Sequence, residues 1–197
     1  MKRNVLFALI TAVLFCCFTT AVGQNDNEHL KFKGVSIDGT LNSFVNKLKA
    51  KGFTYVGKQD GVTLLGGDFA SYKNCLVGIT TYQGKDLVCK VVVIFPNKDT
   101  WSALSNNYFT LKELLTQKYG EPTTIIEEFQ GYEPDSDYSK MHKVKFDECK
   151  YGSVFETDNG FIELIITHID IDTCFVMLSY TDKINSETIT DSAIEDL

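Results

Sequence analysis

Hydrophobic positions along the chain follow first a helical and then a strand-like period. Leu41, Phe44 and Leu48 recur every three or four residues, which is the spacing of one face of an α-helix. The pattern predicts a helix over residues 38–52, with Gly52 ending it. Apolar runs separated by the turn sequences QDG, SYKN and QGKD follow, and they predict four strands. The expected strands span residues 53–58, 62–70, 75–82 and 87–95.

The same order of elements follows a second time. Trp101, Leu104 and Leu111 have helical spacing within residues 100–122, where Gly120 and Pro122 end the pattern. A short helix is expected near residues 139–146, inside an otherwise polar connection. The four strands expected in this half span residues 123–129, 151–157, 160–167 and 173–181.

These elements predict an α+β fold in which two helix-plus-four-strand meander repeats form one antiparallel sheet, with the helices packed on one face. The domain should cover residues 38–183, divided into repeats at 38–96 and 100–183. Residues 24–37 are polar enough to predict a loosely ordered segment, and the acidic tail at 184–197 predicts disorder. The last strands of the two repeats also match in sequence, which favours an internal duplication. The matching residues are Cys89, Val91, Val93 and Phe95, against Cys174, Val176, Leu178 and Tyr180.

The beginning of the chain is typical of a secretory signal peptide. Lys2 and Arg3 precede an apolar run over residues 5–18, and small residues lead to Gly23. The run of about 14 residues is shorter than the ~20 that a membrane-spanning helix needs. We therefore expect residues 1–23 to be removed and the protein to be exported, as a periplasmic or secreted protein without a transmembrane segment.

A lipid anchor is the less favoured alternative for the same region. Lipoprotein cleavage prefers a small residue before the modified cysteine, whereas Cys16 follows Phe15 and Cys17 follows Cys16. This alternative would make the protein an outer-membrane lipoprotein, and an uncleaved anchor also stays open.

Charge argues against nucleic acid as a partner. The net charge is −7, and loss of Lys2 and Arg3 with the signal peptide would make it −9 and remove the only arginine. Arginine is the usual bidentate reader of phosphate and guanine, so an acidic chain without it is poorly suited to bind nucleic acid.

The helix end LLTQKYGEP, within this tandem helix-plus-meander pattern, resembles the beta-lactamase inhibitor protein fold and the related BamE-type outer-membrane assembly modules. Residues 32–185 also resemble, in pattern, uncharacterised secreted proteins of gut-dwelling Gram-negative anaerobes. The resemblance implies a fold and an exported location. It assigns no activity and no functional residue.

Strand register is predicted from the turns. The sequence Asp158-Asn159-Gly160 predicts a tight turn that sets Phe155 opposite Ile162. The next connection should set Ile162 opposite Leu178, so that one face is apolar and packs under the helices.

Four cysteines remain after removal of the leader, and the register keeps them apart. Cys75 is expected opposite Val93, and Cys149 and Cys174 should lie two strand spacings apart, too far for a bridge. We therefore favour free, buried thiols, with Cys89 the fourth. A bridge between the two repeats stays open.

The opposite face of the sheet is expected to mix large apolar residues with a few charges, which is typical of a partner site. The alternative is that the loop at 130–139, a terminus or a dimer mate covers it. Its expected members are Val154, Glu156, Phe161, Glu163, Ile165, Phe175 and Met177, with Leu76, Tyr82, Val88, Lys90, Val92 and Ile94 from the first repeat. The candidate partner-binding residues are Tyr82, Val92, Phe161, Ile165, Phe175 and Met177.

Catalytic and metal-binding signals are weak. His168, Asp170 and Asp172 could place an imidazole and two carboxylates on one side of an extended segment, which is a conceivable metal site. The alternative is an ordinary hairpin connection whose polar side chains face the solvent. Cys149 with His168 or His142 is the only nucleophile–base pair that the sequence offers, and no signature surrounds it.

The sequence thus favours an exported binding module with an unknown protein partner, acting as a monomer or a homodimer. It does not decide whether the protein is an enzyme, although it favours a non-enzymatic role. The alternatives are a small thiol- or metal-dependent hydrolase and a carrier with a small-ligand pocket between helices and sheet. No cofactor is implied.

Overall fold

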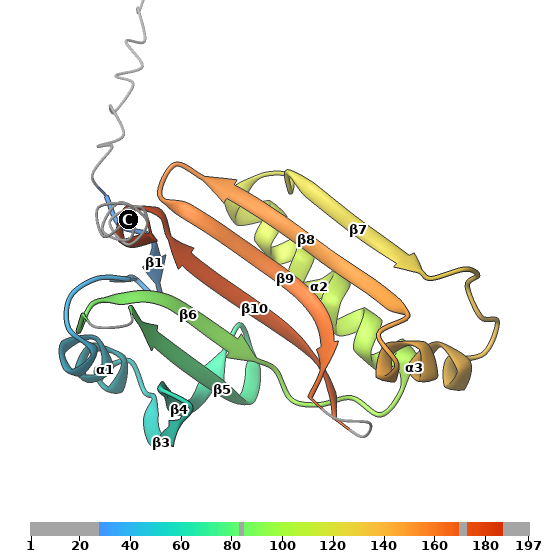
Figure 1. Ribbon diagram of the computed structural model, residues 1–197, viewed down its shortest axis with the longest axis horizontal. Coiled ribbons are helices and arrows are strands. Elements are labelled where there is room, and N and C mark those ends of the chain that lie inside the picture. The colour runs from blue at the N-terminus through green and yellow to red at the C-terminus, as the bar shows by residue number, and fades with distance from the viewer. Residues whose placement is uncertain (1–27, 83–84, 170–172, 187–197) are drawn as a thin grey trace, which may run out of the picture.

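An eight-stranded sheet forms the centre of the protein (Figure 1). The computed structural model describes residues 28–82, 85–169 and 173–186. Every strand pairing in the sheet is antiparallel, and the strand order is β3-β4-β5-β6-β10-β9-β8-β7. The fold is therefore α+β. The strands are β3 Thr54–Gln59, β4 Val62–Phe69, β5 Tyr72–Thr81, β6 Val88–Ile94, β7 Thr124–Phe129, β8 Cys149–Thr157, β9 Gly160–His168 and β10 Cys174–Asp182.

The helices begin where polar side chains cap them. The Thr40 hydroxyl accepts a hydrogen bond from the Ser43 amide at the start of α1 (Leu41–Ala50). The Thr100 hydroxyl accepts one from the Ala103 amide at the start of α2 (Trp101–Tyr119). Asp137, in the first turn of α3 (Asp137–Lys145), accepts hydrogen bonds from the Trp101 and Ser102 amides at 2.9 and 2.7 Å. That carboxylate therefore ties α3 to the start of α2.

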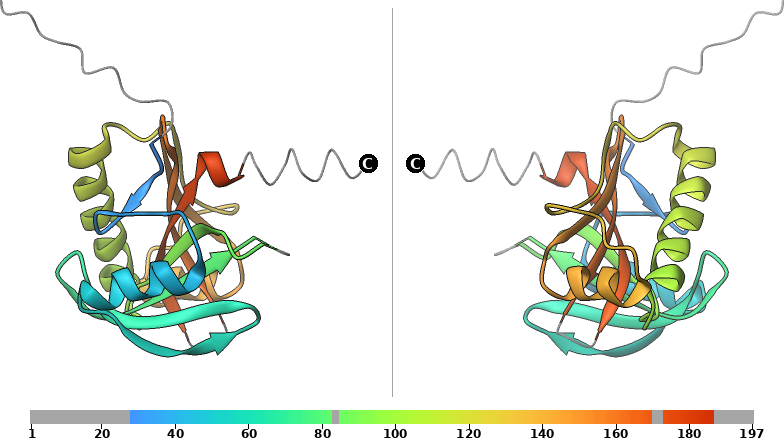
Figure 2. Two further views of the ribbon diagram at one scale, coloured as in Figure 1. Left: turned by 90° about the vertical axis from the view of Figure 1, so that its left-hand side faces the viewer. Right: turned by 90° about the vertical axis from the view of Figure 1, so that its right-hand side faces the viewer.

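One apolar core lies between the helices and one face of the sheet. Figure 2 shows α2 running along one side of the sheet, while no helix of the described residues covers the opposite side of β7–β10 except a single turn at 183–186. Buried side chains of α1, α2 and α3 belong to the same cluster as the inward residues of the strands. Tyr108 and Leu111 of α2 illustrate this, since both are almost fully buried.

The two halves of the sheet join through their last strands. β6 and β10 pair with Val91 opposite Tyr180 and Val93 opposite Leu178. All four side chains are buried, so the core continues across the junction. The sheet consequently has two free edges, β3 and β7.

The predicted turn at Asp158-Asn159-Gly160 is confirmed, because Phe155 lies opposite Ile162. Gly160 has φ of 151°, and a Cβ there would lie 2.1 Å from the Thr181 carbonyl oxygen. A residue with a side chain would collide with this neighbouring backbone.

The next predicted register is wrong by two residues. Leu178 lies opposite Leu164, and Ile162 lies opposite Tyr180. The connection is displaced along the chain by one residue: β9 ends at His168 and β10 begins at Cys174, one residue later than expected in each case, and these two residues pair. A shift of two residues leaves every side chain on its predicted face.

The first half shows the same two-residue shift, with Val77 in place of Cys75 opposite Val93. A bulge between Thr80 and Thr81 then changes the alternation, and Val88 is fully buried in the core. The prediction that placed Val88 on the outer face is therefore wrong.

The segment expected to be loosely ordered contributes to the core. β1 (Lys31–Phe32) and β2 (Val35–Ser36) form a small hairpin, and the fully buried Phe32 ring stacks on Phe69 at 5.1 Å. The prediction for 24–37 is wrong over residues 28–37, and residues 24–27 lie outside the described part.

The prediction of disorder from residue 184 is wrong over residues 184–186. Residues 183–186 form a helical turn in which Asn185 is buried. The rest of that prediction, from residue 187 onward, falls outside the described residues.

Candidate functional site

A row of apolar side chains crosses the face of the sheet that lies opposite the core. Register places Ile165 of β9 beside Met177 of β10, then Met177 beside Ile94 of β6. Each of these side chains is half-buried. The row continues to both sides, and we call it the apolar stripe. Its members are Ile126, Ile165, Met177, Ile94 and Leu76.

A shallow depression interrupts the stripe at Gly152 of β8, between Ile126 and Ile165. Its volume is about 260 Å³, and Val154 and Glu163 also line it. A Cβ on Gly152 would lie 3.4 Å from Ile165 Cγ2, so the glycine leaves a space that a small side chain would begin to fill. The depression is therefore a hollow in an apolar surface.

Four of the six candidate partner-binding residues lie on this face. Ile165 and Met177 belong to the stripe, and Val92 lies in the adjacent row opposite Ser179. Phe161 lies opposite Glu156 of β8 and Thr181 of β10, with 42% of its surface exposed. The sequence therefore identified the face through its alternation of side chains.

The other two candidates do not share the accessible face. Phe175 has the predicted orientation, opposite Thr167, but only 3% of its surface is exposed. Tyr82 lies beyond the end of β5, where it lines a separate depression together with Leu41 and Lys58. The inclusion of Phe175 as an accessible contact residue is therefore wrong, and Tyr82 is not part of the stripe.

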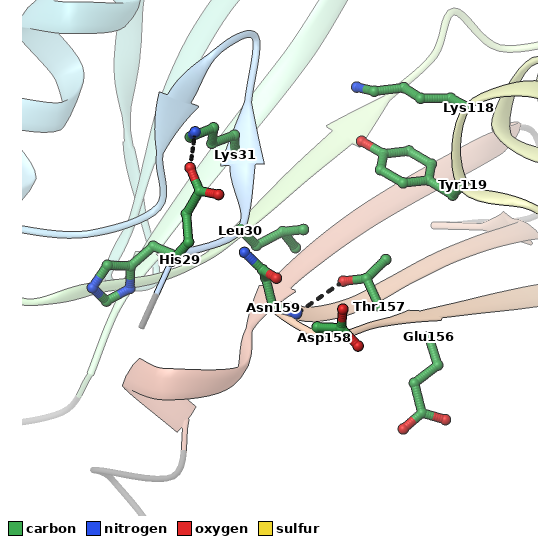
Figure 3. Close-up of a pocket in the computed structure, with 10 residues that line it drawn as sticks. His29, Leu30, Lys31, Lys118, Tyr119, Glu156, Thr157, Asp158 and Asn159 are labelled. Carbon is green, nitrogen blue, oxygen red and sulfur yellow. Dashed lines mark hydrogen bonds and ion pairs between the residues drawn. The ribbon is translucent and has the colours of Figure 1, made fainter. Parts of the chain in front are cut away.

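A polar cleft lies between the N-terminal hairpin and the end of α2 (Figure 3). Lys118 and Tyr119 line one side of this cavity of about 490 Å³, and Glu28 to Lys31 line the other. Lys31 is paired with Glu28, and the Lys118 ammonium lies 4.7 Å from the Tyr119 ring centroid. In Figure 3 the His29 ring points away from Lys118 and Tyr119.

A buried polar cluster below the cleft joins the two ends of the described chain. Asp182, fully buried, accepts hydrogen bonds from the Leu30 and Asn185 amides, both at 2.8 Å. His29 Nδ1 lies 3.1 Å from Asp182 Oδ1, and His29 Nε2 lies 3.5 Å from Asp38 Oδ2. We call these four side chains, His29, Asp38, Asp182 and Asn185, the terminal clamp.

The terminal clamp was not anticipated from sequence. Asn185 Nδ2 also donates to the Ile37 and Val88 carbonyls, at 3.0 and 2.9 Å. These partners lie 148 and 97 positions away along the chain, and no local pattern marks such contacts. The burial of a lone aspartate at a strand end is visible only in three dimensions.

Cys149 is poorly suited to act as a nucleophile. Only 9% of its surface is exposed, and burial raises the pKa of its thiol to about 12. The reactive species is the thiolate, so this environment suppresses reactivity. His168, its proposed base, has Nε2 3.2 Å from Asp147 Oδ1.

All four described cysteines are buried and unbridged, as favoured from the sequence.

The weak metal-site candidate cannot be assembled from described residues. His168 ends β9, whereas Asp170 and Asp172 lie outside the described part of the chain. Among residues 28–82, 85–169 and 173–186, no three His, Cys, Asp or Glu side chains are grouped for metal binding.

The carrier alternative expects a pocket between the helices and the sheet. Between α1 and the sheet, Leu41 and Val45 line an open depression of about 420 Å³ together with Tyr55 of β3 and Thr63 of β4. Between α2 and the sheet the space is occupied by packed side chains, including Leu104, Tyr108 and Leu111. The Tyr108 hydroxyl lies 2.6 Å from Ser153 Oγ and donates to Glu127 at 3.0 Å, and burial raises its pKa. These groups fix α2 to the sheet.

None of the helices in the described segments is sufficiently long and apolar to cross a membrane. Comparison of the chain with protein-family models, with curated proteins and with solved structures gives no match.

Proposed function

We propose that this protein is an exported module that binds a protein partner through the apolar stripe. The stripe carries the proposal, because its side chains are aligned across neighbouring strands, and over β7–β10 the only described helical segment on this face is the single turn at 183–186. A solvated antiparallel sheet face ordinarily alternates to polar residues. Contiguous exposed apolar surface in soluble proteins marks interaction sites.

The depression at Gly152 suggests how a partner would engage. Energetically dominant contacts in interfaces are apolar or aromatic side chains seated in a pocket and shielded from water by their surroundings. Ile126, Val154 and Ile165 provide apolar walls, and the exposed Lys150 and Glu128 lie in the neighbouring row. We infer that the partner inserts an apolar side chain at Gly152, with polar contacts around it.

Export is part of the proposal and rests on the N-terminal sequence. Lys2 and Arg3, the apolar run at 5–18 and the small residues ending at Gly23 support a removed signal peptide over 1–23. The periplasm or the cell exterior is thus the proposed location, with lipidation at Cys17 as the alternative.

The repeat organisation belongs to the proposal as well. Each half of the chain supplies a helix and four strands, α1 with β3–β6 and α2 with β7–β10. The final strands of the two halves pair at the centre of the sheet. This arrangement supports an internal duplication and the resemblance to beta-lactamase-inhibitor-protein-like and BamE-like repeats.

The test uses two substitutions on the stripe. Gly152→Val should fill the depression, and Met177→Glu should place a charge in the row. The wild type and both variants would be used to capture proteins from the cell envelope of the source organism, followed by calorimetry with the purified partner. We expect both variants to raise the Kd about 30-fold or more, as for a hot-spot contact of about 2 kcal/mol.

Gly57→Val is the matched control, because Gly57 lies on β3, at the opposite edge, where an added Cβ would meet no neighbouring atom within 4 Å. It should retain wild-type binding. Urea unfolding of every variant separates lost binding from lost folding. A partner whose affinity is unaffected by Gly152→Val and Met177→Glu, in folded protein, would refute the proposal.

A further inference from the structure

The two edges of the sheet are protected to different degrees. β3 contains a bulge between Tyr55 and Gly57 and carries Lys58, which are features that discourage pairing with another strand. β7 pairs with β8 without any register shift and contains neither lysine nor proline. Ile125 and Ile126 of β7 are 49% and 47% exposed. β7 is therefore a regular edge strand that lacks the bulge and the lysine of β3, and its charges are confined to Glu127 and Glu128.

The backbone groups that β7 offers follow from its pairing with β8. The Gln130 amide donates to the Glu148 carbonyl, and these two residues continue the register of the strands. Gln130 and Glu148 therefore form a hydrogen-bonded pair. Hydrogen-bonded and non-hydrogen-bonded pairs alternate along antiparallel strands, so the other even-numbered residues, Thr124, Ile126 and Glu128, also bond to β8. The N–H and C=O groups of Ile125 and Glu127 consequently point to the open edge.

We infer that β7 pairs with β7 of a second copy of this chain, antiparallel about a two-fold axis at Ile126. In this register Ile125 of one copy forms the hydrogen-bonded pair with Glu127 of the other. Ile126 then meets its own counterpart in a non-hydrogen-bonded pair, where opposite side chains approach most closely.

Charge selects this register over the one shifted toward the end of β7. Centring the axis on Glu127 would place two identical carboxylates opposite each other, which is destabilising. Centring it on Ile126 places Glu128 opposite Thr124, and no like charges face each other. The Glu127 carboxylate is already paired with Lys112 within its own chain, at 2.6 Å.

The second copy also extends the apolar stripe. Ile126 is the stripe residue at the edge of the sheet, and the two-fold axis brings the stripes of both copies end to end on the same face. The dimer would thus align the two apolar stripes end to end, each with its depression at Gly152. This inference concerns assembly and stands whether or not the stripe binds a partner.

Sedimentation analysis of the purified protein tests the dimer. We expect concentration-dependent dimerisation of the wild type, and a dimer Kd more than about tenfold higher for Ile126→Glu and for Ile126→Lys, because each places like charges opposite each other. An equimolar mixture of these two variants should restore association as a mixed dimer, detected by native mass spectrometry.

Two further variants locate the contact. Ile125→Pro removes an outward N–H without affecting the pairing to β8, and it should yield a folded monomer. Val56→Glu changes a residue of similar exposure on the β3 edge and should remain dimeric. A wild type that is monomeric at its solubility limit overturns the inference, as do folded Ile126 variants that still dimerise or a mixture that fails to associate.

Discussion

Burial governs the chemistry of single residues in this protein, and Cys149 shows it most clearly. The thiol lies at the start of β8 among core residues, where desolvation raises its pKa to about 12. Burial also raises the pKa of the Cys75 and Cys89 thiols. Cysteines in such surroundings behave as small hydrophobic residues.

We predict that Cys149 resists alkylation in the folded protein. At pH 8 a pKa of about 12 leaves a thiolate fraction of about 10⁻⁴, roughly a thousandfold below that of an ordinary thiol. Iodoacetamide labelling followed by peptide mass spectrometry should detect modification of Cys149 only after denaturation.

Ile169→Cys provides the matched control, because residue 169 is 69% exposed and its thiol should react at the usual rate. Rapid labelling of Cys149 in the native state would contradict the prediction. It would also restore the thiol-hydrolase alternative.

At the scale of elements, the terminal clamp fixes the β1–β2 hairpin to the end of β10. Asp182 supplies both carboxylate oxygens to donors from the opposite end of the chain and from the following turn. Buried donors that lose their acceptor are costly, especially when the acceptor is charged. The hairpin thus depends on one side chain as well as on the packing of Phe32.

We predict that Asp182→Asn lowers the free energy of unfolding by about 3 kcal/mol, because the new side-chain amide would direct its own N–H group at a backbone N–H donor. Asp147→Asn is the control, since Asp147 also contacts a histidine but its side chain is 90% exposed. Asp147→Asn should lower the free energy of unfolding by less than about 0.5 kcal/mol. Urea unfolding measures both, and equal costs would show that the terminal clamp does not stabilise the fold.

At the scale of the whole molecule, the buried thiols and phenols set the response to alkaline pH. Burial raises the pKa of Cys149 and Tyr151 to about 12, and it also raises the pKa of Tyr108 and Tyr180. These groups keep their protons in the folded state at a pH where the unfolded chain has released them.

Linkage then requires stability to fall as pH rises. The contribution of these groups is complete below the ordinary thiol and phenol values of 9.0 and 10.0, and it is lost as pH rises toward 12. The free energy of unfolding, measured with urea, should therefore be unaffected by these groups up to about pH 8. It should decline steadily above about pH 9. Tyr151→Phe should make the decline shallower, and a stability that holds constant to about pH 11 would contradict the assignment.

Local patterns in the sequence were sufficient to predict helices α1–α3 and strands β3–β10, and to assign most strand residues to the correct face of the sheet. The spacing of Leu41, Phe44 and Leu48 predicted α1, and the turn at Gly160 predicted the β8–β9 pairing, because both depend on near neighbours. Alternation along the strands placed Ile165 and Met177 on the outer face even where the register was wrong by two residues. A period of two makes the face insensitive to such a shift.

Accessibility and the anchoring of the chain ends depend instead on tertiary contacts. Phe175 has the predicted orientation yet is buried, and Val88 turns inward at a bulge. The N-terminal hairpin is ordered through contacts with Phe69 and Asp182, far along the sequence. Burial is a sum over neighbours brought together by folding, and pairs separated by most of the chain leave no periodic trace in the sequence.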